Sequence, residues 1–154
     1  MASAVHFIHF VTYTLDMFFQ GILTVISKKV PVRGVIGLPP DDLKRGLIKE
    51  GASSALKNRA GTEIYFDRTE PFKEAHQKLL IIDGVLAFAG SMNLTWNAMD
   101  KLSREVRREY LDVITSIAQV KKLNNEYFSP LFQACQDSYY KWKSESGELP
   151  DVPF

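Results

Sequence analysis

The residues that could carry chemistry in this 154-residue chain lie in one short stretch near its middle. An imidazole can attack phosphorus or transfer a proton near neutral pH, and an ammonium can neutralise phosphate oxygens. A hydroxyl and a carboxamide can donate hydrogen bonds to the same oxygens. The stretch holds all four kinds of side chain, so it predicts a phosphate site that needs no metal. Together with an aspartate and a glycine, these residues are His76, Lys78, Asp83, Gly90, Ser91 and Asn93.

A β-hairpin is expected to hold these side chains together. Residues 76–82 and 85–90 are two apolar runs, and Asp83-Gly84 separates them. This dipeptide is typical of a two-residue turn between antiparallel strands. The sequence therefore predicts two paired strands with the polar residues at their open ends.

On such a hairpin the polar side chains would share one face. Successive residues of a strand point to opposite faces, so His76 and Lys78 are expected on the same face. A two-residue turn would set Ser91 opposite His76. It would also set Ala89 opposite Lys78, where a small side chain leaves room for the lysine. Asn93 stands two residues after Ser91 and would join them.

The pattern His-x-Lys-x4-Asp followed by Gly-Ser-x-Asn resembles the HKD signature of the phospholipase D superfamily at every fixed position. A pattern of this length is rarely matched by chance. The resemblance implies that His76 is a nucleophile that forms a phosphohistidine. It also implies that Lys78 and Asn93 bind the phosphate with Ser91 in support, whereas Asp83 is structural.

The resemblance implies one more residue, a glutamate at the start of the next strand that holds the far nitrogen of the histidine. Glu109, just before the apolar run 110–115, matches that position. Its carboxylate would fix the tautomer and stabilise the imidazolium. The alternative is a solvated acid at the end of a strand. Gly90 belongs with Asp83 to the structural part of the motif.

The chain has one copy of the motif, whereas larger members of the superfamily have two and use the second histidine to protonate the leaving oxygen. His6 and His9 cannot replace it, because neither is followed by a lysine two residues later. We expect both in the first strand. The small single-motif endonucleases of the superfamily complete their site by two-fold dimerisation, so the resemblance implies a homodimer.

The function implied by the resemblance is that of a metal-independent phosphodiesterase without a cofactor, most simply an endonuclease that cleaves DNA or RNA, with DNA as the expected substrate ahead of RNA. Two alternatives stay open. One is a phospholipid-cleaving hydrolase, although such a substrate favours an exposed hydrophobic rim or a basic amphipathic helix, and the sequence reveals neither. The other is a nucleic-acid-binding domain of a larger protein with lost or incomplete activity.

Composition limits the partners and the metal chemistry. The chain is 45% apolar and 24% charged, which is typical of one soluble domain. Its net charge of +1 is too small to attract the whole protein to nucleic acid or to an anionic membrane. Cys135 is the single cysteine and there are three histidines in total, so neither an internal disulfide nor a Cys/His metal centre is expected. We therefore expect a reducing, cytoplasmic location.

The largely apolar segment 4–26 could suggest a membrane anchor. Polar residues interrupt it and no basic segment precedes it, so we expect a buried strand followed by a helix, and no stable membrane association. The interrupting residues are His6, His9, Asp16 and Gln20.

The apolar patterns predict an α/β fold that would position the hairpin. Strands and helices alternate in the first part of the chain, as in parallel α/β units. We expect a phospholipase D-like, mixed, largely parallel sheet with flanking helices in one domain over residues 1–143, and a polar tail over 144–154. Besides the hairpin, the expected strands are 5–13, 32–37, 62–66 and 110–115. The expected helices begin at Leu15 after a Thr14 N-cap, near Pro39, and at Ile117, where Pro130 should bend or end the last one.

Two features beside the motif have open interpretations. Trp96 could stack on a base or serve as a core or interface anchor. A basic cluster could contact the backbone of a nucleic acid, or it could form an exposed, ion-paired segment. The cluster consists of Lys101, Arg104, Arg107 and Arg108.

Overall fold

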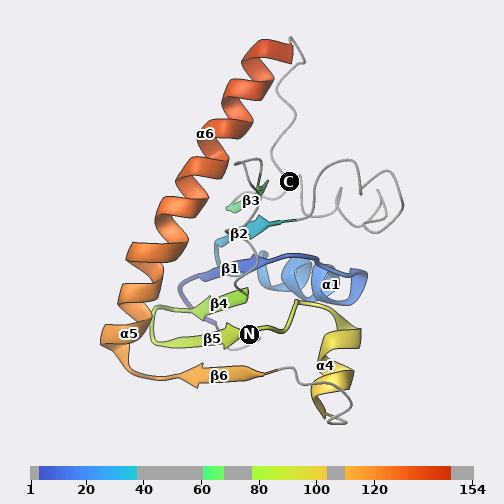
Figure 1. Ribbon diagram of the computed structural model, residues 1–154, viewed down its shortest axis with the longest axis vertical. Helices are drawn as coiled ribbons and strands as arrows, with labels where there is room; N and C mark the ends of the chain where they lie inside the picture. Colours follow the sequence, from blue (N-terminus) through green and yellow to red (C-terminus); the bar gives the residue numbers. More distant parts are fainter. Residues whose placement is uncertain (1–3, 38–60, 68–77, 104–109, 147–154) are drawn as a thin grey trace.

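Six strands form one mixed sheet in the computed structural model, which describes residues 4–37, 61–67, 78–103 and 110–146 (Figure 1). They are β1 (Ile8–Thr12), β2 (Val32–Ile36), β3 (Thr62–Phe66), β4 (Lys78–Ile82), β5 (Leu86–Gly90) and β6 (Leu111–Ile114). Their order across the sheet is β3-β2-β1-β4-β5-β6. The neighbours among β1, β2 and β3 are parallel and the others are antiparallel. This arrangement confirms the mixed α/β fold, but the sheet is not largely parallel, because among the described strands only β1, β2 and β3 pair in parallel.

Helices cover both faces of the sheet. Figure 1 shows α6 on one side and α1 with α4 on the other. The helix expected near Pro39 lies outside the described residues. The described helices are α1 (Met17–Ile26), α4 (Trp96–Ser103), α5 (Ile117–Lys122), the π-helix η2 (Leu123–Phe128) and α6 (Ser129–Ser146).

The alternation of side chains along the strands divides the core into two layers. Phe10 of β1 packs in the layer beneath α1, together with Leu23. Its neighbour Val11 points to the opposite face and packs with Phe128 of η2 and Cys135 of α6. Each layer of apolar contacts therefore fixes the position of one helix against the sheet.

The apolar N-terminal segment forms β1 and α1. The helix begins one residue after Asp16, whose carboxylate accepts the Phe19 N–H at 3.1 Å, so the N-cap is Asp16 and not Thr14. Leu15, the expected first helical residue, instead forms an isolated bridge with Leu94. Within the described part of the chain, no helix is long and apolar enough to cross a membrane.

The expectation that Pro130 could end the last helix is wrong, because α6 continues to Ser146. A proline disrupts an α-helix by lacking an N–H for the carbonyl four residues earlier. Here the preceding turn is already π-helical, with the Ser129 N–H donating to the Asn124 carbonyl five residues back. Pro130 therefore falls at the start of a new α-helical segment, where its missing donor costs little. The helix also includes the first residues of the segment 144–154 that the sequence predicted to be a tail.

His9 of β1 is held in an aromatic sandwich beneath the π-helix. Its ring lies 4.4 Å from the ring centroid of Phe7 and stacks on Phe128 at 4.3 Å. The Nδ1 atom lies 2.8 Å from Oδ1 of Asn124. Desolvation lowers the pKa of His9 below its usual 6.5, and the positive charge of Arg33 acts in the same direction, against the hydrogen bond with Asn124.

We expect the free energy of unfolding to decrease as the pH falls below 6.5, the ordinary histidine value. Below this pH His9 binds a proton in the unfolded chain but stays neutral in the folded protein. The free energy of unfolding therefore falls until the pH is below the lowered pKa of the folded state, where both states are protonated. Urea unfolding at about pH 7.5 and about pH 5.5 measures the difference. His9→Gln has no group that titrates in this range and should show a smaller difference. An unchanged difference in this variant would contradict the assignment.

Candidate functional site

The candidate site lies at the edge of the sheet where the parallel strands β1, β2 and β3 end. Ligands of open α/β sheets bind outside this carboxyl edge. Because β4 and β6 run in the opposite direction, they begin at this edge, and Lys78, Gly90 and Leu111 follow one another across β4, β5 and β6. His76 and Glu109 precede β4 and β6 in the sequence and lie outside the described residues.

The pairing register of the hairpin differs by one residue from the register that the sequence predicts. Lys78 pairs with Gly90, so the prediction that Ala89 lies opposite Lys78 is wrong. The expected pairing of Ser91 with His76 used the same register and loses its basis. Lys78 therefore lies opposite a glycine, and the missing side chain of Gly90 allows the Tyr110 carbonyl to approach the backbone of β5 closely.

One additional residue in the turn causes this shift. Asp83 and Gly84 have φ angles of 55° and 69°, and the Val85 N–H donates to the Ile82 carbonyl at 3.1 Å, as expected for an Asp-Gly turn. The strand pairing then resumes with Leu86, not Val85, opposite Ile82. The loop thus has three residues, and every later residue of β5 moves by one position.

The Asp83 carboxylate fastens the hairpin to the chain before β1, at the opposite end of β4 from Lys78. It accepts the backbone N–H groups of Val5, His6 and Phe7 at 3.0, 2.8 and 2.9 Å. Burial disfavours the ionised carboxylate, but these hydrogen bonds outweigh it and hold the pKa of Asp83 below its usual value. Asp83 is therefore a tertiary anchor that lies away from the candidate site.

Asn93 ties the loop after β5 to the end of β1. Its Oδ1 accepts the Tyr13 N–H at 3.1 Å and lies 3.4 Å from the Thr12 hydroxyl. The Leu94 N–H donates to the same hydroxyl at 3.0 Å. Because the carboxamide oxygen is engaged in this way, the Nδ2 amino group is the part of Asn93 suited to donate to an anion.

Lys78 lies next to the same residues. Its Nζ is 5.8 Å from the centroid of the Tyr13 ring, within the range of a cation–π contact. Tyr13 therefore lies between the two donors, with its ring toward Lys78 and its backbone N–H bonded to Asn93. Sequence reasoning missed Thr12 and Tyr13, because a threonine and a tyrosine at the end of a strand carry no recognisable signal.

Ser91 joins the end of β5 to the residue before β6. Its N–H donates to the Tyr110 carbonyl at 3.2 Å, and its Oγ accepts the Tyr110 N–H at 3.2 Å. These two bonds fix the backbone of Tyr110, the residue that follows Glu109. Ser91 thus has a positioning role that the sequence did not indicate.

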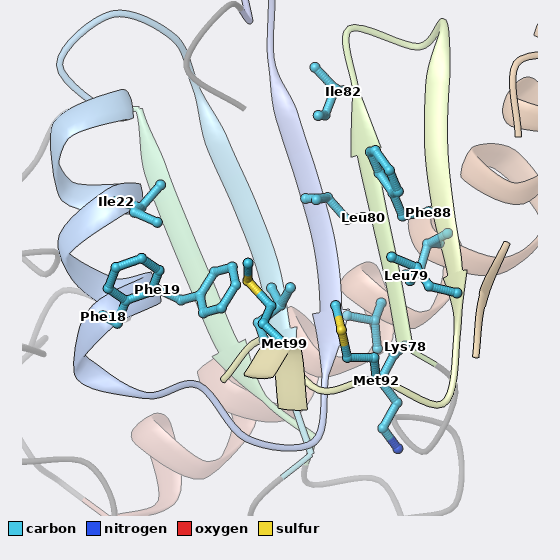
Figure 2. Close-up of a pocket in the computed structure, with 13 residues that line it drawn as sticks. Phe18, Phe19, Ile22, Lys78, Leu79, Leu80, Ile82, Phe88, Met92 and Met99 are labelled. Atoms are coloured by element: carbon cyan, nitrogen blue, oxygen red, sulfur yellow. The ribbon is translucent and has the colours of Figure 1, made fainter. Parts of the chain in front are cut away.

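A large apolar cavity of about 680 Å³ opens beside Lys78 on the α1 face of the sheet. Figure 2 shows side chains of α1 and α4 facing those of β4 and β5, with the Lys78 ammonium at one edge of the group and pointing away from it. Phe18 and Met99 are 46% and 39% exposed, so the cavity has the hydrophobic rim that the sequence did not reveal. The lining residues are Val11, Phe18, Phe19, Ile22, Lys78, Leu79, Leu80, Ile82, Phe88, Met92, Leu94, Met99 and Leu111.

Asp16 holds the two helices that border this cavity. Besides capping α1, its carboxylate accepts a hydrogen bond from the N–H of Trp96, the first residue of α4. The Trp96 ring is 52% exposed and lies 4.9 Å from the Phe18 ring, so it is not a core residue. Its possible roles in stacking or in an interface stay open. In the basic cluster, Arg104, Arg107 and Arg108 lie outside the described residues, and the Lys101 side chain is not described.

Comparison with known proteins finds a family and two similar structures. A family model described as cardiolipin synthase, PLD-like domain, matches residues 1–130. NucT from Helicobacter pylori is 19% identical with a TM-score of 0.64, over 89% of this chain and 82% of its own. Nuc from Salmonella typhimurium, described as a phospholipase D family member, is 21% identical with a TM-score of 0.58, over 88% and 81%. At these identities the likeness concerns the fold. No curated protein matches the sequence significantly.

Gly90→Ala should destabilise the protein by about 1–3 kcal/mol. A Cβ at this position would lie 2.1 Å from the Tyr110 carbonyl oxygen and would push β6 away from β5. Gly21→Ala is the matched control, because an added Cβ there meets nothing within 4 Å. This exposed helical position should gain about 0.5–1 kcal/mol. Urea unfolding measures both, and a Gly90→Ala variant as stable as the parent would contradict the close approach of β6.

Proposed function

Because the chain belongs to the phospholipase D superfamily, as the match over residues 1–130 shows, we propose that it is a metal-independent phosphodiesterase that cleaves nucleic acid, with DNA as the expected substrate ahead of RNA. The observation that carries this proposal is the grouping of Lys78 and Asn93 around Tyr13 at the carboxyl edge of the sheet. An ammonium and an oriented amide donor at one edge suit the non-bridging oxygens of a phosphodiester.

His76 is the proposed nucleophile. It stands two residues before Lys78 in the sequence, so the backbone joins it directly to the phosphate-binding edge. A neutral imidazole nitrogen would attack phosphorus, forming the P–N bond while the bond to the leaving oxygen breaks. A second, protonated histidine would give its proton to that oxygen. Water would then give a proton to the second histidine, which is now neutral, and attack phosphorus, so that the P–N bond breaks and the imidazole of His76 is restored.

Glu109 is the proposed orienting acid for His76. Ser91 supports this assignment, because its two hydrogen bonds with Tyr110 hold the neighbouring backbone beside the end of β5. A carboxylate at this position would favour the required tautomer and stabilise the imidazolium. Ser91 would assist Lys78 and Asn93 at the phosphate.

The second histidine is proposed to come from a second copy of the chain. One motif copy provides one His76, whereas the reaction needs both a nucleophile and an acid. A two-fold dimer that brings two such edges together would supply both. We also expect a cytoplasmic location, since the sequence contains a single cysteine, Cys135, and therefore no internal disulfide.

The large apolar cavity favours a second candidate function, the hydrolysis of phospholipids. Its lining is apolar apart from Lys78, which would hold a phosphate at the edge of the cavity while an acyl chain occupied the interior. The rim residues Phe18 and Met99 would contact the lipid surface. Phospholipid vesicles are therefore a necessary second substrate in any assay of this protein.

Cleavage should persist in excess EDTA and should disappear in His76→Asn, because the proposed nucleophile is a nitrogen of the chain itself. Labelled single- and double-stranded DNA, RNA and phospholipid vesicles are incubated with each variant. A denaturing quench at alkaline pH should leave a base-stable, acid-labile phosphoryl label on the parent and none on His76→Asn. His6→Asn, at an exposed histidine before β1, is the control and should retain activity. Activity that requires added magnesium, or full activity in His76→Asn, would refute the mechanism, and hydrolysis of vesicles alone would favour the second candidate.

A dimer should be present at micromolar concentrations, because a monomer has a single copy of His76. Light scattering gives the mass in solution, and the activity is measured over a dilution series. Specific activity should decrease on dilution in parallel with dissociation of the dimer. A fully active monomer would show that one chain contains the whole site.

A further inference from the structure

A second cavity, of about 220 Å³, lies beside Lys78 between the sheet and the π-helix η2. Two tyrosines line it, the half-buried Tyr127 of η2 and Tyr110, which is 60% exposed. Ala89 of β5 and the exposed carboxylate of Asp112 in β6 also line it. Unlike the large cavity, this one combines aromatic rings, a hydrogen-bond acceptor and the proposed phosphate-binding lysine.

We propose that this cavity receives the base of the nucleotide whose phosphate is bound at Lys78. The inference rests on the proposed function for the phosphate and adds to it a base-binding subsite and a strand preference. The ligand class is a nucleotide with an amino group on its base, held in a single strand.

The pairing of the strands shapes the subsite. Ala89 pairs with Asp112, and its small side chain leaves the floor of the cavity open between β4 and β6. Lys78 pairs with Gly90, the residue after Ala89, so the side chains of Lys78 and Asp112 leave the sheet on opposite faces, from backbones two strand spacings or about 10 Å apart. Because both residues line the cavity at the carboxyl edge of the sheet, a bound nucleotide would pass around this edge, with its phosphate at Lys78 and its base on the η2 side.

The side chains that line the cavity can bind both the ring and the polar edge of a nucleobase. Tyrosine rings stack on nucleobases, and stacking tolerates any base because each has a π-face. A carboxylate accepts hydrogen bonds from exocyclic amino groups, as Asp does with N4 of cytosine. Asp112 would therefore favour cytosine over uracil or thymine, which present a carbonyl oxygen at that position.

A base can reach such a cavity only when it is unstacked and unpaired. Recognition by stacking on aromatic side chains and by contacts to the base edge is typical of single strands, because a duplex must first pay the energy of unpairing. The subsite thus predicts preferential cleavage of single-stranded nucleic acid.

Titration with three small phosphates tests the subsite without requiring catalysis. Binding of cytidine 5′-monophosphate, uridine 5′-monophosphate and ribose 5-phosphate is followed by NMR chemical shifts of the full chain. We expect the cytidine nucleotide to bind about tenfold more tightly than the uridine nucleotide. Both should bind more tightly than ribose 5-phosphate, since only they stack. Equal affinities for all three would overturn the proposal.

Two substitutions separate the acceptor from a general charge effect. Asp112→Asn should reduce the preference for cytidine over uridine to less than about threefold. Asp137→Asn, which removes an equal charge from the exposed face of α6, should leave the preference unchanged. Tyr127→Leu should weaken both nucleotides by about tenfold and leave ribose 5-phosphate unaffected. An Asp112→Asn variant with the full preference would contradict the role of this carboxylate.

Cleavage assays distinguish failure of the subsite from failure of the proposed function. A single-stranded oligonucleotide with one abasic position should be cut less next to that position than its intact counterpart. Equal cleavage of the abasic and the intact oligonucleotide would refute the base-binding subsite but would agree with the proposed nuclease activity. If no nucleic acid is cut but cytidine 5′-monophosphate binds with a preference that depends on Asp112, the nuclease proposal fails and the subsite stands.

Discussion

The hydrogen bonds between the end of β1 and the loop after β5 are the constraint on which the candidate site depends. These strands are not neighbours, because β4 lies between them. The bond from Tyr13 to Asn93 and the bond from Leu94 to Thr12 therefore pass over the starting end of β4, where Lys78 stands. The tie determines both which atoms of Asn93 can meet a ligand and how near the lysine they lie.

The hydrogen bonds accepted by Asp16 are a second polar contact near the same end of β1. Asp16 follows β1 and accepts N–H groups from Phe19 and Trp96, one in each of the two helices that border the large cavity. Hydrogen bonds can define positions at the end of a sheet, where a loop has few apolar side chains to pack. Asp16 therefore ties the first turns of α1 and α4 together beside the large cavity.

Local patterns were sufficient to predict much of the scaffold. The strand expected over residues 62–66 has those limits, and the helix after β1 begins within two residues of its expected start. The Asp-Gly turn was also found, but the register was not, because the pattern cannot show that Val85 is left out of the ladder. One additional residue in the loop therefore changes the cross-strand neighbour of every residue in β5.

Contacts between distant segments could not be predicted in this way. Asn93 and Thr12 are 81 residues apart, and no periodicity connects them. The large cavity is assembled from side chains of α1, α4 and several strands, and each of these side chains has the ordinary pattern of a core residue. The motif supplied the proposed roles of His76 and Glu109, whereas the positioning by Thr12, Tyr13 and Asp16 required the structure.

The π-helix makes the rotational phase of the long C-terminal helix depend on its exact residue count. A wider turn accommodates one more residue than an α-turn, so deleting a single residue between Leu123 and Phe128 would let the segment revert to α-helix. In that case Phe132 and Cys135 would still face the sheet. If the segment did not revert, the missing residue would rotate every side chain of α6 by about 100°, the angle per residue of an α-helix. The additional residue in the π-helix therefore sets the angular alignment of the 18-residue helix α6 with its core.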